Sequence, residues 1–192
     1  MSEAQQQAGA ARTDTFAYDP LSIFLHWSVG LLIVYQMFFP PEIEGLGIEV
    51  RAPLVTTHTG LGLIILVLVA LRVAWRLVRG PAPEVPQTPE WQNRAARFVH
   101  NAFYVLIVLT PLLGFLSTFS APYEIAPFDM FVLNAGESEE TWAFAVPSNI
   151  HKQCSRIMIG LFAVHVLAAL YHYFVVKDGV LQRMLPFLPR RA

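Results

Sequence analysis

Four of the six histidines in this chain lie inside or at the end of long apolar segments: His26, His58, His151 and His165. His151 and His165 are fourteen residues apart, which on an α-helix is about 21 Å of rise and close to a whole number of turns. One helix would therefore present two imidazoles on one face, near opposite sides of a bilayer. Two other segments supply one histidine each, so the pattern predicts two haems, each with two histidine ligands, stacked across a membrane.

Depth in the membrane predicts the pairs: His26 with His165, and His58 with His151. A lone histidine near a helix end is more often a packed side chain, and zinc or copper is the main competing ligand chemistry. The two pairs are, however, too far apart to share one metal and lack carboxylate or thiolate companions at depth. There is no CxxCH motif, and the one cysteine is Cys154. The haems are therefore expected to be bound non-covalently.

The segments that carry these histidines have the composition of a membrane protein. Of the 192 residues, 55% are hydrophobic and 14% are charged, and the mean hydropathy is +0.47, which excludes an ordinary soluble domain. Four stretches reach the length of about 20 apolar residues that a spanning helix needs: 21–39, 54–78, 98–119 and 150–176. The predicted fold class is all-α, an integral membrane four-helix transmembrane bundle binding two b-type haems.

The positions of lysine and arginine predict how the bundle is oriented. Most of them lie on the side that holds both chain ends, whereas the opposite side is rich in glutamate. Cytoplasmic loops are enriched in lysine and arginine, so both termini are expected to be cytoplasmic. The net charge of −1 gives no indication of nucleic-acid binding. The first apolar run has no cleavage site at its end, so we expect an uncleaved anchor.

The chain is expected to form one domain, over residues 16–188. The polar residues 1–15 have the composition of a disordered cytoplasmic arm, and 189–192 form a short tail. The proline-rich residues 80–90 predict an extended connector. The long external loop, 120–148, is expected to fold over the end of the bundle as a lid, with a short helix lying at the interface.

Charged side chains near the histidines are further candidate site residues. Arg72 and Arg76 are candidates for binding haem propionates, because a guanidinium matches a carboxylate bidentately; the alternative is that they only set the orientation. Lys152 and Arg156 interrupt the fourth apolar segment at its external end. They are candidates for neutralising haem propionates or for attracting a small anion to the external haem, with interfacial snorkelling as the alternative.

Two histidines remain, both at the cytoplasmic edge. His100 lies at the expected start of the third helix and is a candidate cofactor contact, with an interfacial contact to water or lipid as the other interpretation. His172 lies two turns beyond His165. A titratable imidazole there could deliver protons to a bound quinone, whose reduction consumes them.

Several motifs resemble those of the bacterial cytochrome b561 family, over residues 16 to 188. They are LSIFLHW at 21–27, THTG at 57–60, LRVAWR at 71–76, LTPLLG at 109–114, and HVLAALYHYF at 165–174, which is followed by Lys177 and Asp178. The resemblance implies a diheme protein of the bacterial inner membrane with His26, His58, His151 and His165 as haem ligands. It also implies a role for His172 at a ubiquinone site.

A close member of that family passes electrons from periplasmic superoxide to ubiquinone. We therefore expect superoxide as the donor and ubiquinone as the acceptor, with Lys152 and Arg156 acting at the donor side. The external loop departs from that member's pattern, so a second hypothesis stays open. In it the chain is a membrane subunit that exchanges electrons between quinone and a hydrogenase, a dehydrogenase or a small periplasmic carrier. A haem-free transporter or structural protein is a third.

Overall fold

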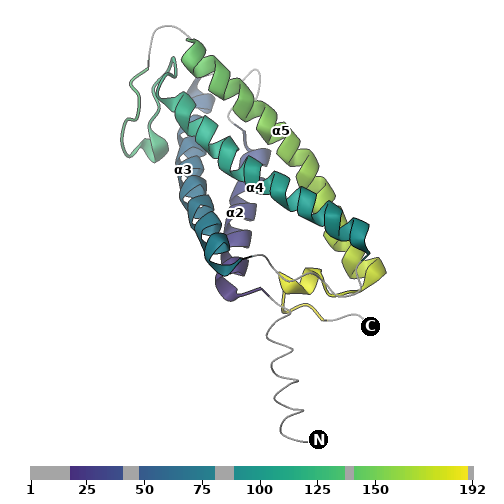
Figure 1. The fold of residues 1–192 in the computed structure, drawn as a ribbon. Coiled ribbons are helices and arrows are strands. Elements are labelled where there is room, and N and C mark those ends of the chain that lie inside the picture. The colour runs from purple at the N-terminus through teal and green to yellow at the C-terminus, as the bar shows by residue number, and fades with distance from the viewer. Residues whose placement is uncertain (1–17, 41–47, 81–88, 137–140, 190–192) are drawn as a thin grey trace, which may run out of the picture.

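Four long helices make up most of the structure, a computed structural model that describes residues 18–40, 48–80, 89–136 and 141–189. They are α2 (Pro20–Phe38), α3 (Ile48–Arg79), α4 (Glu90–Thr118) and α5 (Trp142–Tyr171), and the π-helical turn η2 (His172–Val176) continues α5. Each contains a stretch long and apolar enough to cross a membrane. Figure 1 shows the four running together as one bundle, so the predicted all-α membrane fold is confirmed. The expected arm, 1–15, lies outside the described residues.

Three helices begin earlier than the sequence predicts. α3 and α5 begin six and eight residues before the expected positions 54 and 150, and each includes a proline near its start, Pro53 or Pro147. We expected the helices to begin after these prolines, but a proline near a helix N-terminus removes few backbone hydrogen bonds. α4 begins eight residues before position 98, over the polar sequence EWQNRAAR, which apolar patterning does not detect.

α5 and η2 together are longer than a membrane span needs, 35 residues from Trp142 to Val176. From Arg156 to Val176 is twenty residues, or about 30 Å of rise, which is the thickness of a hydrocarbon core. Lys152 and Arg156 are ten and fourteen residues inside the helix rather than at its start, and an apolar run of membrane length follows them.

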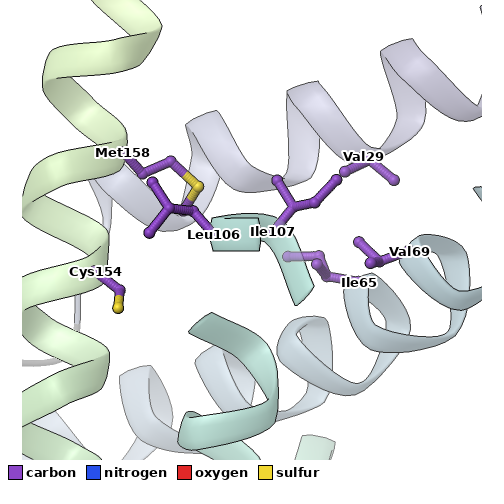
Figure 2. Packing of buried hydrophobic residues seen from close by; sticks show 7 residues of the cluster. All are labelled: Val29, Ile65, Val69, Leu106, Ile107, Cys154 and Met158. Atoms are coloured by element: carbon purple, nitrogen blue, oxygen red, sulfur yellow. The ribbon is translucent and has the colours of Figure 1, made fainter. Parts of the chain in front are cut away.

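A small apolar core holds the helices together. Val29, Ile65, Val69, Leu106, Ile107, Cys154 and Met158 form one buried cluster, called the central cluster here, with members on all four helices (Figure 2). Outside it, large apolar side chains point outward; Val67, Phe98 and Leu167 are 61%, 71% and 65% exposed. Such a surface is the one that lipid tails solvate, so the exterior has the character expected of a membrane span.

At one end of the bundle α2 and α4 begin and α3 and α5 end (Figure 1); we call this the basic end. Asp19 caps α2 there by accepting a hydrogen bond from the Ser22 N–H at 3.0 Å and one from the Trp75 indole at 3.1 Å. Burial alone would raise the pKa of the Asp19 carboxyl, but these hydrogen bonds and the nearby Arg79 guanidinium hold it below its usual value. The cap therefore ties α2 to α3.

The segment after η2 folds back against α2 at the same end. The Tyr18 N–H donates to the Arg183 carbonyl at 3.2 Å, and the Trp27 indole donates to the Met184 carbonyl at 3.0 Å. The Arg183 guanidinium also lies 4.9 Å from the Tyr18 ring centroid. These contacts close the basic end of the bundle beside α2.

The opposite end, called the loop end, carries the connection between α4 and α5. Its described residues contain the 3-10 turn η1 (Pro127–Asp129) and an isolated antiparallel bridge between Ile125 and Asn134. η1 packs against α3, and an ideal Cβ built on Gly60 would fall only 2.4 Å from the Phe128 ring. The loop therefore rests on α3 two residues from His58, at a position where only glycine leaves room.

Candidate functional site

Four imidazoles come together in two pairs, one toward each end of the bundle. The ring centroids of His26 on α2 and His165 on α5 are 6.2 Å apart. Those of His58 on α3 and His151 on α5 are 6.0 Å apart. These are the pairs predicted from depth, and α5 contributes one member to each.

The separation within each pair matches two ligands of one metal ion. An imidazole nitrogen binds a metal at about 2 Å, so two rings on opposite sides of one ion have their centroids about 6 Å apart. No group of three or more His, Cys, Asp or Glu side chains in the described parts of the chain could hold a metal. Two imidazoles on opposite sides of one ion fit a cofactor that supplies the other ligands itself, as haem does.

The surroundings of His151 select which ring nitrogen can bind iron. Its Nδ1 lies 2.8 Å from the Thr110 carbonyl oxygen, which only accepts hydrogen bonds, so Nδ1 carries the proton and Nε2 keeps its lone pair. The ring reaches this carbonyl because Gly114, one turn further along α4, has no side chain. A Cβ there would be 3.0 Å from His151 Nδ1.

His100 lies beside the pair at the basic end. Since α4 begins at Glu90, His100 is ten residues inside the helix, not at its start as the sequence indicated. Its ring centroid is 5.8 Å from that of His165, and the Phe103 ring is 5.5 Å from His165 on the same side. His100 is exposed but lies beside His165, so it stays a candidate cofactor contact.

Arg72 and Arg76, one turn apart on α3, have different partners. The partly buried Arg72 guanidinium lies 3.3 Å from His26 Nδ1 and 5.8 Å from the Tyr104 ring centroid, and no carboxylate among the described residues forms an ion pair with it. Arg76 instead donates to the Gly80 carbonyl at the end of its own helix. Arg72 is thus a partly buried cation, and the carboxylate of a haem propionate could form an ion pair with it.

The contact between Arg72 and His26 excludes one state of that ring. A guanidinium only donates hydrogen bonds, so in this contact Nδ1 accepts and Nε2 carries the proton. Binding iron through Nε2 requires the opposite tautomer. A haem held through His26 Nε2 would therefore require this contact to break, which would leave the Arg72 guanidinium to pair with an anionic group.

Comparison with known proteins identifies the family. The family model described as prokaryotic cytochrome b561 matches residues 17–187, nearly the whole chain. The chain belongs to the prokaryotic cytochrome b561 family. It is accordingly a b-type haem protein of bacterial membrane electron transfer, and the predicted resemblance is confirmed.

Three relatives of this cytochrome match over most of their own length. Cytochrome b561 homolog 1 of Escherichia coli is 30% identical over 174 residues, covering 88% of this chain and 97% of the relative. Cytochrome b562 of Cereibacter sphaeroides is 28% identical over 174 residues, covering 88% and 94%. A Yersinia pestis protein named probable superoxide oxidase CybB is 27% identical over 170 residues, covering 88% and 96%.

At the loop end of this cytochrome, Lys152 and Arg156 do not point the way His151 does. They follow it by one and five residues, which on an α-helix is a rotation of about 100° and 140°. Arg156 is exposed and Lys152 is partly buried. The two cations lie at the depth of the His58 and His151 pair but on another face of α5, so they can act on an approaching anion only through their field.

His172 lies at the basic end, as the first residue of η2. Its ring faces the Asp178 carboxylate rather than either imidazole pair. The sequence motif includes both residues, but the contact between them was not predicted, because residues six apart would not share a face of a regular helix.

Proposed function

We propose that this cytochrome holds two non-covalent haem b groups, one between His26 and His165 and the other between His58 and His151. The observation that carries the proposal is the separation of the ring centroids, 6.2 and 6.0 Å, in both pairs. Haem with two imidazole ligands supplies one-electron transfer in a form closed to small ligands.

The side chains around the pairs hold and separate the two haems. Arg72 binds a propionate at the basic end, and the His100 ring lies beside that of His165. The Thr110 carbonyl fixes the orientation of His151. The central cluster lies between the two layers of histidines along every helix and keeps water out of the path that the electron crosses.

The positive charges at the basic end support one orientation of the bundle in the membrane. Arginines gather there among the described residues, at Arg72, Arg76, Arg79, Arg94, Arg97 and Arg183, and positive residues mark the cytoplasmic side of a membrane protein. The basic end and both termini then face the cytoplasm in the bacterial inner membrane, and the loop end faces outward. Arg12, Arg190 and Arg191, which also favour this orientation, lie outside the described residues.

We propose that the electrons come from superoxide outside and reach ubiquinone at the basic end. Each superoxide gives up one electron and leaves as dioxygen, and two such electrons with two protons convert a quinone to quinol. Lys152 and Arg156 raise the local concentration of the anion at the loop end, and His172 supplies a proton to the quinone. The name of the Yersinia pestis relative, probable superoxide oxidase, supports this choice of donor.

The experiment that tests the donor measures superoxide consumption by the purified, haem-loaded protein with and without a short-chain ubiquinone. We expect consumption that depends on both protein and quinone. The double variant Lys152→Gln/Arg156→Gln should lose about tenfold in kcat/KM for superoxide at low salt, with less effect at high salt. Arg94→Gln, at the other end of the bundle, is the control. If the haems are reduced normally but the protein shows no quinone-dependent superoxide consumption, superoxide is not the electron donor.

A membrane subunit that receives electrons from an external redox protein is the second candidate, and one observation favours it. Phe128, Met130, Phe131 and Val132 are 40%, 76%, 51% and 57% exposed at the loop end, which gives a partner an apolar surface to contact. Several acidic residues of the external loops, Glu42, Glu44, Glu137, Glu139 and Glu140, lie outside the described residues. Co-purification of a stoichiometric partner would favour this candidate over a self-sufficient enzyme.

A further inference from the structure

At the basic end His172 and Asp178 form a close pair. The ring Nδ1 lies 2.5 Å from Asp178 Oδ2, and the two side chains are only 17% and 15% exposed. The backbone N–H of Val180 donates to the other carboxylate oxygen, Oδ1, at 3.1 Å. Both oxygens of the carboxylate are thus held, and the ring of His172 is fixed against one of them.

The backbone is shaped in a way that makes this pair possible. Six residues along a regular α-helix correspond to a rotation of about 240°, which would turn Asp178 away from His172. Instead the helix ends in the π turn η2, where the Lys177 N–H donates to the His172 carbonyl at 2.6 Å. Lys177 has a φ of +59°, a left-handed conformation that lysine rarely adopts. The chain therefore folds back and brings Asp178 to the ring.

We propose that Asp178 is a positioning residue for proton transfer to the quinone, acting through His172. The inference rests on the proposed function, in which ubiquinone is reduced at this end. A carboxylate accepts hydrogen bonds only, so the proton shared with it stays on Nδ1. Nε2 is then the nitrogen that exchanges protons with the substrate, in one ring orientation.

Reduction of the quinone to quinol takes two electrons, which arrive through the haems, and two protons. Two electrons reach the quinone one at a time, and each of its two carbonyl oxygens gains a proton. For one oxygen, the Nε2–H bond of His172 breaks as the O–H bond forms, and the ring regains its proton at Nε2 from cytoplasmic water. The other oxygen takes its proton from cytoplasmic water directly. Asp178 keeps the proton on Nδ1 throughout and loses none itself.

The test measures reoxidation of the dithionite-reduced protein by a short-chain ubiquinone in stopped flow, so that it does not depend on the natural donor. Asp178→Asn, which can leave Nδ1 without its fixed acceptor, should lower the reoxidation rate at saturating quinone about tenfold or more. The half-saturating quinone concentration and the haem spectrum should stay as in the wild type. Asp178→Glu, which keeps the carboxylate, should recover part of the rate.

A second pair of variants leaves Asp178 in place. Val180 has a φ of −53°, which proline adopts without strain, so Val180→Pro removes the N–H that holds Oδ1. Val180→Ala keeps that N–H and is the matched control. We expect a slower saturating rate in Val180→Pro than in Val180→Ala, a comparison that stands even if Asp178→Asn fails to fold.

Two results would overturn the inference, and they differ in what they say of the proposed function. If His172→Gln slows reoxidation but Asp178→Asn does not, Asp178 has no positioning role and the quinone site survives. If neither variant changes the rate, the quinone is reduced elsewhere and both proposals fail at this end. Equal rates in Val180→Pro and Val180→Ala would also count against Asp178.

Discussion

Replacing Gly114 with alanine would place a methyl group against the imidazole of His151. An ideal Cβ at this position lies 3.0 Å from Cε1 and Nδ1 of the ring, and ordinary contact begins at 3.4 Å. The ring must therefore retreat from α4 by about 0.4 Å or more. Its Nδ1–H donates to the Thr110 carbonyl on that same helix, at 2.8 Å, so the displacement stretches or breaks this hydrogen bond.

Gly114→Ala should weaken the binding of one haem while changing the folding stability little. Loss of a hydrogen bond of this kind costs about 0.5–1.5 kcal/mol, and loss of such a partner of a metal-bound histidine lowers metal affinity about 10–100-fold. Alanine, however, favours a helix interior over glycine by about 1 kcal/mol. The two stability terms nearly offset each other, so Gly114→Ala should unfold at a temperature close to the wild type without haem while binding one haem more weakly.

The assay is titration of haem into the haem-free protein, followed by absorbance, with stoichiometry from the pyridine haemochrome. We expect one tight and one weakened site in Gly114→Ala. Gly160→Ala is the control, because it lies on the same helix as His151 and a Cβ there meets nothing within 4 Å. Two unchanged sites in Gly114→Ala would refute the idea that this glycine makes room for a haem ligand.

Three further predictions concern the basic end. Arg72→Gln should lower the midpoint potential of one haem in a redox titration, because a nearby positive charge disfavours the oxidised iron, whereas Arg76→Gln should leave both potentials unchanged. Asp19→Ala should destabilise the protein by about 1 kcal/mol near neutral pH. Since the pKa of Asp19 lies below its usual 3.8, the difference in thermal unfolding from the wild type should hold above pH 5 and vanish as the pH falls through the folded-state value; a difference that persists in acid would contradict this. His100→Gln should keep both haems, and loss of one would make His100 a ligand in place of another histidine.

Helical periodicity made much of the site predictable. The fourteen residues between His151 and His165 fix two imidazoles on one face of α5 whatever surrounds them, and apolar length gave the depth of His26 and His58. The structure places the same pairs 6.2 and 6.0 Å apart. These features depend on local geometry alone, which a single sequence specifies.

Features that depend on how helices begin and end were not predictable in this way. Apolar length marks the part of a helix in the membrane, so it missed the polar first turns of α4, and His100 lies ten residues inside the helix rather than near its start. The contact between His172 and Asp178 needs a π turn and a left-handed lysine at position 177. Lysine has no preference for the left-handed conformation, so no local sequence pattern predicted the contact between His172 and Asp178.

Haem stoichiometry in single histidine variants tests the central proposal most directly. We expect His58→Ala and His151→Ala each to lose the same single haem, and His26→Ala and His165→Ala each to lose the other. The remaining haem should stay low-spin. Retention of two low-spin haems in His165→Ala, or loss of different haems in His58→Ala and His151→Ala, would contradict it.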